Sequence, residues 1–596
     1  MTQIRVMEIK RVFDILEKLK LNSTKKDVLN IKVNKQWVHC SAEEFILKAN
    51  YVSSALLHIG LLPKDIVAVM AGNMPKWNFV DYGSQQVNMP TAPIFPTLSN
   101  DDLKYILNHC EAKIIFISDK ATYQKVLAIK NELIHLKHIY SFNEIEGVHS
   151  FDDFVLLGEK HFNATKLQAI KDSVLEDDLL TILYTSGTTG QPKGVMLSHK
   201  NLVENVKITQ NLAPFTNKWR ALSFLPLNHV YERFLNTMYL FHDVSIYYAE
   251  NFETIGDNCR ELHPEMFVAV PRILERVLEK ICAAGEKLTG FKKVIFNWSL
   301  NLAERFELHG ANGPWYALQR KIADKLVYKK WREAVGGNIV AIASGGAALN
   351  PRIERIFYCA GLNLLQGYGL TETCVVVSIN RFDEDNRMFG TTGVVVENSQ
   401  VKIADEDGEI LMKGPSLMLG YYKNPEATAE VIDSEGWFHT GDVGVIIDSK
   451  FLKITDRKKE LFKTSSGKYI SPIAIENKLK ESKYIEQCMV VGSGQKYASA
   501  IIIPSILNFK DYFSQHNLVW SPNEDICLNE EVKKVISEHV KKVNATLAPY
   551  EQLKRHQLIT AVWGIESGEI TPKLSLKRKI IHQNHLAVIN KIFGED

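Results

Sequence analysis

The sequence has few cysteines and no closely paired ones. None of them forms a Cys-x-x-Cys pair, so the sequence gives no support for a zinc site or a dithiol redox site. Scattered thiols in a chain of 596 residues are typical of a protein from a reducing compartment. The eight cysteines stand at positions 40, 110, 259, 282, 359, 374, 488 and 527.

Long hydrophobic runs are also missing. No run reaches the ~18 apolar residues that a membrane-spanning helix needs. Charges interrupt the segment Met1–Lys20 every few positions, so it does not resemble a secretory signal peptide. We therefore expect a cytoplasmic protein. Peripheral contact with the inner face of a membrane stays open, although no amphipathic anchor stands out.

Neither sign of charge is in excess. The 71 Lys and Arg residues against 69 Asp and Glu residues leave a net charge of +2, which gives no reason to expect nucleic acid as a partner. The chain is too long for one hydrophobic core, so we expect two or more domains. A hydrophobic content of 45% with 23% charged residues is the balance of a globular protein.

The first half of the chain alternates between helical patterns and short apolar runs. The runs Ile66–Met70 and Lys113–Ile117 have the length and composition of buried strands. Helical patterns lie near residues 75–87 and 100–110. This alternation predicts an α/β fold with a mostly parallel sheet.

One stretch organises the chain. The apolar run Leu179–Tyr184 predicts a strand, and Val195–Leu197 predicts a second. Between them, Thr185–Gly194 reads Thr-Ser-Gly-Thr-Thr-Gly-Gln-Pro-Lys-Gly. Its glycines, four hydroxyl side chains and Lys193 together suit a polyphosphate. It is not a Walker loop, because no Gly-Lys-Ser/Thr follows. The alternative is a polar turn between two strands.

These ten positions resemble the phosphate loop of the acyl-adenylate-forming (AMP-binding) superfamily, which includes acyl-CoA synthetases, peptide-synthetase adenylation domains and beetle luciferases. The resemblance covers nearly the whole chain and is least specific at its start. It implies a large N-terminal AMP-binding domain with mixed and parallel sheets, residues 1–456. It also implies a small mobile C-terminal α+β domain, residues 457–596, where short apolar runs alternate with helical patterns.

The resemblance implies that ATP binds to several motifs. Tyr368 offers an aromatic face to a purine, Asp442 matches the aspartate that accepts hydrogen bonds from the ribose hydroxyls, and Arg457 matches an arginine that contacts the nucleotide. A strand end and a capped helix would be the structural alternative for the motif around Tyr368. The predicted nucleotide-binding residues are Thr185, Ser186, Gly187, Thr188, Thr189, Gly190, Lys193, Gly345, Gly346, Ala347, Gln366, Gly367, Tyr368, Gly369, Asp442, Arg457 and Lys459.

Three further residues have predicted roles at the reacting groups. Thr371 offers a hydroxyl to the α-phosphate, and Glu372 offers a hard oxygen ligand to Mg²⁺. Thr185 is the second predicted metal ligand. His229, which follows Leu225-Pro-Leu227, lines the carboxylate-substrate pocket by the same resemblance. A lone histidine is otherwise more often structural than functional.

Two segments resemble the long-chain fatty acyl-CoA synthetases, in particular those of bacterial type. These are Val230–Arg233, which reads Val-Tyr-Glu-Arg, and Val268–Arg276. The long helical stretch at about 272–335 also resembles an insertion of that subfamily. A strand that leads into an ordinary amphipathic helix explains Val268–Arg276 equally well.

The terminal motif Gly568–Lys579 resembles the catalytic-lysine motif of the family, and we assign the lysine to Lys577. Lys573 and Lys579 lie close enough to leave the register open. A basic surface loop, or contacts of Lys573, Arg578 and Lys579 with coenzyme A phosphates, are alternatives. Lys459 matches the position at which the family hinges between its domains.

The function that the resemblance implies is ATP-dependent ligation of a long-chain fatty acid to coenzyme A through an acyl-adenylate. ATP, Mg²⁺ and coenzyme A would take part, and AMP and pyrophosphate would leave. An acyl-AMP ligase, a ligase for medium-chain or aromatic acids, a luciferase-like oxygenase and a non-catalytic binding protein are the alternatives. The sequence does not decide between a monomer and a homodimer.

Overall fold

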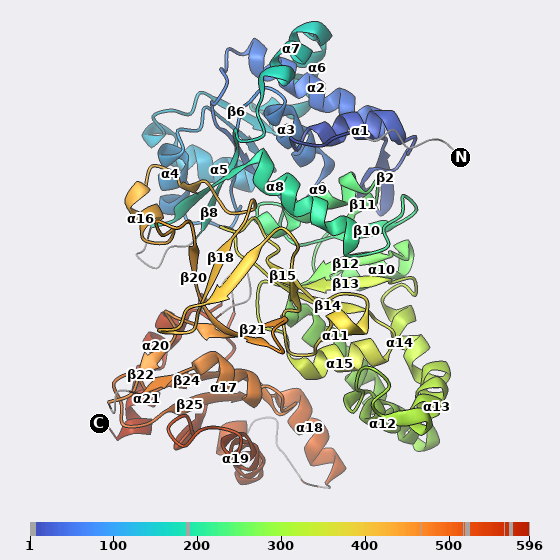
Figure 1. Cartoon of the computed structure of the whole chain (residues 1–596), viewed down its shortest axis with the longest axis vertical. Coiled ribbons are helices and arrows are strands. Elements are labelled where there is room, and N and C mark those ends of the chain that lie inside the picture. The colour runs from blue at the N-terminus through green and yellow to red at the C-terminus, as the bar shows by residue number, and fades with distance from the viewer. Residues whose placement is uncertain are drawn as a thin grey trace.

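The computed structural model describes residues 7–185, 191–465, 468–516, 518, 525–564, 567–570 and 576–594. The chain runs from helices and strands at the top of Figure 1 to a smaller group of elements at the bottom, drawn in orange and red. The strands described here form two large and two small sheets.

All but one of the strands of the first sheet come from the first 200 residues of the chain. Its central strands β3 (Val67–Met70) and β5 (Ile114–Ile117) are entirely buried, as continuous apolar runs in a covered parallel sheet must be. The predicted strand at 66–70 and the predicted strand at 113–117 are thus confirmed. In spatial order the sheet contains β19 (Gly420–Tyr421), β9 (Lys193–Ser198), β8 (Leu179–Thr185), β4 (Thr91–Pro93), β3, β5, β6 (His138–Ser141) and β7 (His149–Ser150).

Helices of the first half of the chain flank this sheet and pack on one another. Helix α2 packs against α3 and α6. Both α3 and α4 begin and end within two residues of the predicted helical patterns. The helices of this part are α1 (Asp14–Asn22), α2 (Ala42–His58), α3 (Pro75–Gln85), α4 (Asn100–His109), α5 (Lys120–Ile129), α6 (Phe151–Lys160), α7 (Ala164–Ser173) and α8 (His199–Lys207).

In one half of the second large sheet the strands are parallel except for an antiparallel strand at the outer edge, and the other half is antiparallel. The parallel half ends at β14 (Leu364–Tyr368), after which the neighbouring strands alternate in direction. The sheet contains, in order, β17 (Gln400–Ile403), β18 (Glu409–Lys413), β20 (Phe438–Ile447), β21 (Phe451–Arg457), β16 (Val394–Val395), β15 (Ser378–Ile379), β14, β13 (Ala341–Ser344), β12 (Met266–Ala269), β10 (Arg220–Ser223), β11 (Ser245–Tyr248), β1 (Leu29–Val33) and β2 (Gln36–Cys40).

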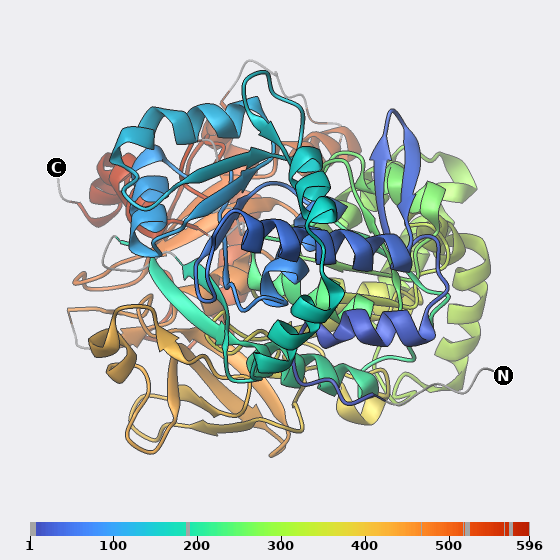
Figure 2. The ribbon, with the colours of Figure 1, turned by 90° about the horizontal axis from the view of Figure 1, so that it is seen from above.

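The long helical stretch predicted at 272–335 is divided into shorter helices. The second and third of these helices begin at Gly290 and Gly313, both of which have positive φ. Seen from above, these green helices lie at the opposite side of the molecule from the orange strands around residue 410 (Figure 2). The helices are α11 (Pro271–Glu286), α12 (Gly290–Glu304), α13 (Gly313–Ala323) and α14 (Lys329–Ala334), with a π-helical turn at Asp324–Tyr328 between the last two. They follow α9 (Val230–Phe241) and α10 (Ile255–Leu262), and α15 (Pro351–Cys359) comes after them.

After residue 460 the chain forms a smaller unit with its own apolar cores. Ile502 and Phe509 are fully buried there. The described strands are β22 (Phe462–Lys463), β23 (Tyr469–Ile470), β24 (Ile485–Val491), β25 (Ser499–Pro504) and β26 (Arg555–Leu558). The helices are α17 (Pro472–Leu479), α18 (Ile506–Gln515), α19 (Glu530–Asn544), α20 (Arg578–Asn584) and α21 (Leu586–Phe593). In the described part of the chain, no helix combines the length and the hydropathy needed to cross a bilayer.

Candidate functional site

The predicted phosphate loop lies between two paired strands. Thr185 ends β8 and pairs with Lys193, which begins β9. Ser186, Gly187, Thr188, Thr189 and Gly190 lie outside the described residues. The two ends of the loop are thereby held at one edge of the first sheet, with the Lys193 side chain half-buried beside Tyr421.

Tyr421 links Lys193 to Glu372. The Lys193 ammonium lies 5.0 Å from the centroid of the Tyr421 ring, and the Tyr421 hydroxyl donates a hydrogen bond of 3.0 Å to Oε1 of Glu372. Thr371, next to Glu372, is buried. Tyr421 was not predicted from the sequence, because an isolated tyrosine on a two-residue strand has no motif of its own. The result is a cation over the ring of Tyr421 and a carboxylate at its hydroxyl.

A second polar group joins β14 to β20 and β21. The Tyr368 hydroxyl donates a hydrogen bond of 2.7 Å to Oδ2 of Asp442, and Nε of Arg457 lies 3.2 Å from Oδ1. Burial raises the pKa of the Asp442 carboxyl, while the Arg457 guanidinium and the Tyr368 hydroxyl oppose that shift. The structure therefore brings together three residues that the sequence places up to 89 positions apart, from 368 to 457.

The predicted glycine-rich turns follow β13 and lie at the end of β14. Gly345, Gly346 and Ala347 follow the end of β13, and Gln366 and Gly367 are part of β14. A Cβ atom at Gly345 would lie 3.4 Å from the Tyr231 ring. At Gly369 it would lie 1.1 Å from the carbonyl oxygen of Val375, so only glycine fits there.

His229 caps the N-terminus of α9 and lines a large cavity. Its Nδ1 accepts a hydrogen bond of 3.1 Å from the backbone N–H of Tyr231. The cavity has a volume of about 1720 Å³, and Gly346 of the glycine-rich turn also lines it. The predicted acid-site histidine and the predicted adenine turn thus border the same space.

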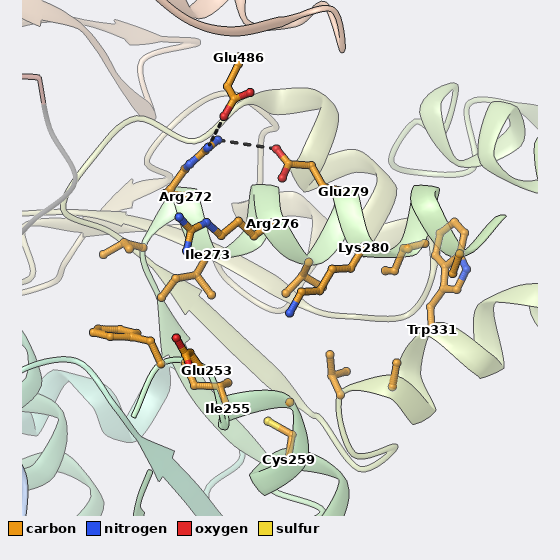
Figure 3. Close-up of a pocket in the computed structure, with 18 of the residues that line it drawn as sticks. Glu253, Ile255, Cys259, Arg272, Ile273, Arg276, Glu279, Lys280, Trp331 and Glu486 are labelled. Atoms are coloured by element: carbon orange, nitrogen blue, oxygen red, sulfur yellow. Dashed lines mark ion pairs between the residues drawn. The ribbon is translucent and has the colours of Figure 1, made fainter. Parts of the chain in front are cut away.

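Most of the cavity wall comes from the helices after β12. Figure 3 shows Lys280 on α11 directed into the cavity, and Cys259 and Ile255 of α10 on the opposite side. Trp331, on α14, lies at one end. The apolar part of the wall includes Ile273, Val277, Ile281, Leu288, Phe296 and Trp331.

The C-terminal unit closes one side of this cavity. Trp563 and Ile570 contribute to its wall, as does Glu486 of β24. The Arg272 guanidinium at the start of α11 lies 3.7 Å from the Glu486 carboxylate, and 3.7 Å from that of Glu279 (Figure 3). The cavity is therefore shared between the large and small parts of the chain.

A buried polar cluster supports α9 behind His229. Ser223 donates a hydrogen bond of 2.5 Å to Oε1 of Glu232, which also accepts one of 3.1 Å from Asn236. Burial raises the pKa of Glu232 to about 8, so this carboxyl is protonated at neutral pH. Beside it, Arg233 forms a buried ion pair of 2.6 Å with Asp81. In the sequence, Glu232 and Arg233 resemble only a subfamily signature, and their supporting role was not predicted.

Lys577 lies immediately before α20 with an exposed side chain, and its backbone N–H donates a hydrogen bond of 2.7 Å to the Glu569 carbonyl. Lys573 falls outside the described residues. Arg578 makes ion pairs of 2.8 Å with Glu460 and 2.6 Å with Glu476. Its guanidinium is therefore paired with carboxylates of the C-terminal part of the chain, and a contact of Arg578 with a coenzyme A phosphate stays a prediction.

The predicted hinge region directly follows β21. Lys459 is exposed. Its neighbour Lys458 is tied to the large part of the chain by ion pairs of 2.6 Å with Asp407 and 2.8 Å with Glu409. These two carboxylates raise the pKa of Lys458 to about 12, so the ion pairs persist through the neutral range.

The donor set around Glu372 fits a magnesium ion better than a transition metal. A carboxylate beside hydroxyl side chains supplies hard oxygen ligands, and Mg²⁺ takes few protein ligands because it keeps water and substrate phosphates. Within the described ranges, no group of three or more His, Cys, Asp or Glu side chains is arranged to hold a metal ion.

Comparison with protein families and known proteins gives a consistent result. The family model described as AMP-binding enzyme matches residues 22–422, and that of the AMP-binding enzyme C-terminal domain matches residues 460–596. The chain is 30% identical over 575 residues to the peroxisomal long chain acyl-CoA synthetase 6 of Arabidopsis thaliana, covering 91% of this chain and 80% of that protein. It is 29% identical over 566 residues to the long-chain-fatty-acid–CoA ligase FadD15 of Mycobacterium bovis, covering 94% of this chain and 93% of that one.

Solved structures share the fold. The adenylation domain of a carboxylate reductase from Mycobacterium chelonae superposes with a TM-score of 0.75 at 20% identity, covering 99% of this chain and 92% of that domain. An anthranilate CoA ligase in complex with anthranoyl-AMP gives a TM-score of 0.72 at 17% identity, covering 97% of this chain and 98% of that one. The predicted α/β architecture, with a large N-terminal part and a small C-terminal part, is confirmed.

Proposed function

Because the chain belongs to the AMP-binding enzyme family, we propose that it ligates a long-chain fatty acid to coenzyme A with ATP, through an acyl-adenylate. AMP and pyrophosphate are the other products. The relatives at about 30% identity that cover most of the chain carry the names of long-chain acyl-CoA synthetases and ligases.

The observation that carries the long-chain assignment is the cavity that His229 and Gly346 share with the apolar wall of α11, α12 and α14. Its volume of about 1720 Å³ exceeds the ~300–1,000 Å³ of ordinary small-molecule pockets. A carboxylate near His229 and Gly346 would leave the alkyl chain directed toward Trp331 and Phe296. Burial of its methylene groups there supplies the binding free energy, at ~0.8 kcal/mol each.

In the first half-reaction the fatty carboxylate attacks the α-phosphate of ATP and pyrophosphate leaves in line. This chemistry needs positioning and charge neutralisation rather than a nucleophilic side chain. We propose that Lys193 and Thr371 bind the phosphates of ATP. Its nucleoside would be bound by Tyr368, Asp442 and Arg457. Glu372 and Thr185 would hold Mg²⁺, which neutralises phosphate charge when bound.

In the second half-reaction the coenzyme A thiol attacks the carbonyl carbon of the acyl-adenylate and AMP leaves. We propose that residues 1–456 and 457–596 act as two domains, that Lys577 serves the first step, and that the small domain turns about Lys459 before the second. The separate cores of the C-terminal unit support this division.

The test is ATP–pyrophosphate exchange measured across acids of increasing chain length, followed by assays of coenzyme A consumption and AMP release. We expect exchange to be strongest with long-chain acids and coenzyme A to be consumed. Strongest exchange with short or aromatic acids would overturn the chain-length assignment and keep the mechanism. Exchange without coenzyme A consumption would point to an acyl-AMP ligase, and ATP binding without exchange to a non-catalytic protein.

A further inference from the structure

Helix α13 and the π-helical turn that follows it expose a row of large apolar side chains. Trp315, Leu318, Ile322 and Leu326 stand at intervals of three and four residues, which places them on one face of a helix. Trp315 is 70% exposed, Leu318 49% and Ile322 47%. We call these four residues the α13 stripe. A row of this kind on a protein surface usually marks an interaction site.

The other face of the same helix is fixed to the protein. Ala323 and Tyr328 are buried, and the hydroxyls of Tyr316 and Tyr328 donate hydrogen bonds of 2.5 and 2.7 Å to the α12 carbonyls of Leu302 and Ser299. Packing and hydrogen bonds to α12 therefore fix the orientation of the α13 stripe. The apolar side chains at the start of α12, Phe291 and Val294, are exposed as well.

The segment that carries the stripe, from α13 through the π-helical turn to the end of α14, is basic. Residues 313–334 contain six Lys or Arg residues and two acidic ones, a net charge of +4, whereas the whole chain carries +2. Of the two acidic residues, Asp324 is neutralised by an ion pair of 2.6 Å with Arg332. Lys321, Lys325 and Lys330 form no ion pair with any residue that the structure describes.

The stripe is continuous with the proposed acyl cavity. Leu326 belongs to the stripe and also lines the cavity, together with Lys330 on α14. On α12, Lys292 and Ile295 also line the cavity. One end of the apolar surface therefore leads from the outside of the molecule into the cavity.

We propose that the α13 stripe docks on an anionic lipid bilayer and places the opening of the cavity at the membrane surface. Apolar side chains enter the headgroup region while the lysines reach anionic headgroups, as in other interfacial helices. A symmetric contact with a second copy is disfavoured, because it would bring Lys321, Lys325 and Lys329 of both copies together. The role of the docked cavity rests on the proposed function, whereas the docking itself does not.

The direct test is sedimentation of the full-length protein with sucrose-loaded vesicles of phosphatidylcholine, with and without about 30% phosphatidylglycerol. The test variant carries Leu318→Glu and Ile322→Glu, neither of which lines the cavity. The matched control carries Leu127→Glu on α5 and Leu156→Glu on α6, which are 48% and 51% exposed. Circular dichroism checks that each variant is folded.

We expect the wild type and the control to sediment with the anionic vesicles and the stripe variant to bind at least ~10-fold more weakly. About 0.5 M salt should weaken binding further, because it screens the charges.

A second variant, Lys321→Gln with Lys325→Gln, should lose binding to anionic vesicles and remain folded. Equal sedimentation of wild type and stripe variant, or no sedimentation of the wild type, would overturn the proposal. A wild-type dimer that becomes monomeric in the stripe variant, with vesicle binding unchanged, would assign the stripe to a second copy and also overturn it.

A kinetic measurement separates this proposal from the proposed function. With the acid supplied as dissolved monomer, exchange should be the same in the wild type, the stripe variant and the control. With the acid supplied in anionic vesicles, the rate of ATP–pyrophosphate exchange should fall several-fold in the stripe variant and not in the wild type or the control. Absence of exchange in the wild type with every acid would defeat the ligase assignment and leave the vesicle-binding result standing.

Discussion

The nucleotide group and the acyl cavity are built in different ways. The nucleotide group depends on a few polar side chains, of which Tyr368, Asp442 and Arg457 contact one another directly. The cavity is formed by many side chains from α10, α11, α12, α14 and the C-terminal unit, and no single contact defines it. Polar recognition therefore requires particular residue types at particular places, whereas the cavity requires only a shape and an apolar lining.

This contrast predicts that one polar substitution has a larger effect than one apolar substitution, and the largest effect is expected at Lys577. In Lys577→Ala, adenylation should fall by ~10²–10³, the usual cost of one preorganised charge contact at a reacting group. Thioester formation from supplied acyl-adenylate should stay close to the wild-type rate. Single-turnover assays of each half-reaction give the two numbers.

The matched control for Lys577 is Lys579→Ala, because Lys579 is equally exposed and two residues away. It should retain both half-reactions. A loss of adenylation in Lys579→Ala instead would assign the catalytic role to Lys579 and not to Lys577. Equal loss of both half-reactions in Lys577→Ala would contradict its assignment to the first step.

The next largest effect is expected at Asp442. Asp442→Asn keeps the side-chain shape but removes the charge that Arg457 meets at 3.2 Å. A hydrogen bond to a charged group contributes ~1.5–3 kcal/mol, so AMP affinity measured by calorimetry should fall by ~10–100-fold. Tyr368→Phe removes only the hydroxyl that contacts Asp442 and should weaken AMP binding less. A Tyr368→Phe loss as large as that of Asp442→Asn would mean that Asp442 acts only through the tyrosine.

The same contrast explains what the sequence could predict. Buried strands such as β3 and β5 were predictable because a covered parallel strand must be a continuous apolar run. The division of the 272–335 stretch into separate helices was not predicted, since Gly290 and Gly313 are also tolerated inside a helix at a modest cost. In the structure they adopt positive φ and are the first residues of α12 and α13.

At the site, the polar motifs were predictable and their partners were not. Asp442 and Glu372 stand in motifs whose residue order is specific, so their neighbourhood could be inferred. Tyr421 and Glu232 gain their roles from tertiary contacts with distant residues. The α13 stripe escaped detection for a related reason: in sequence, an apolar helical face looks the same whether it packs on a core or faces solvent.

A smaller effect is expected from filling the cavity. Ala284 lies on α11, lines the cavity and is exposed. In Ala284→Phe the added ring should exclude several methylene groups of a long acid, each of which contributes ~1 kcal/mol. The kcat/KM ratio between a long and a medium acid should fall by ~10-fold or more. Ala128→Phe, at an exposed position on α5, is the control and should leave the ratio unchanged.

The smallest effect on activity is expected at Glu232, which belongs to the buried polar cluster behind His229. Glu232 should instead make the stability of the protein depend on pH. Its pKa is raised from 4.5 to about 8 by burial, so between these values the folded chain keeps a proton that the unfolded chain has lost. The free energy of unfolding must therefore fall as pH rises from about 5 to 8, by up to about 5 kcal/mol from this group.

Glu232→Gln preserves an oxygen for Ser223 and Asn236 and removes the titration. Urea denaturation should show the variant gaining stability relative to the wild type across this range, whereas the exposed control Glu430→Gln should show no trend. A constant difference between Glu232→Gln and the wild type would mean that Glu232 is ionised in the folded protein, with a counter-charge that compensates its burial.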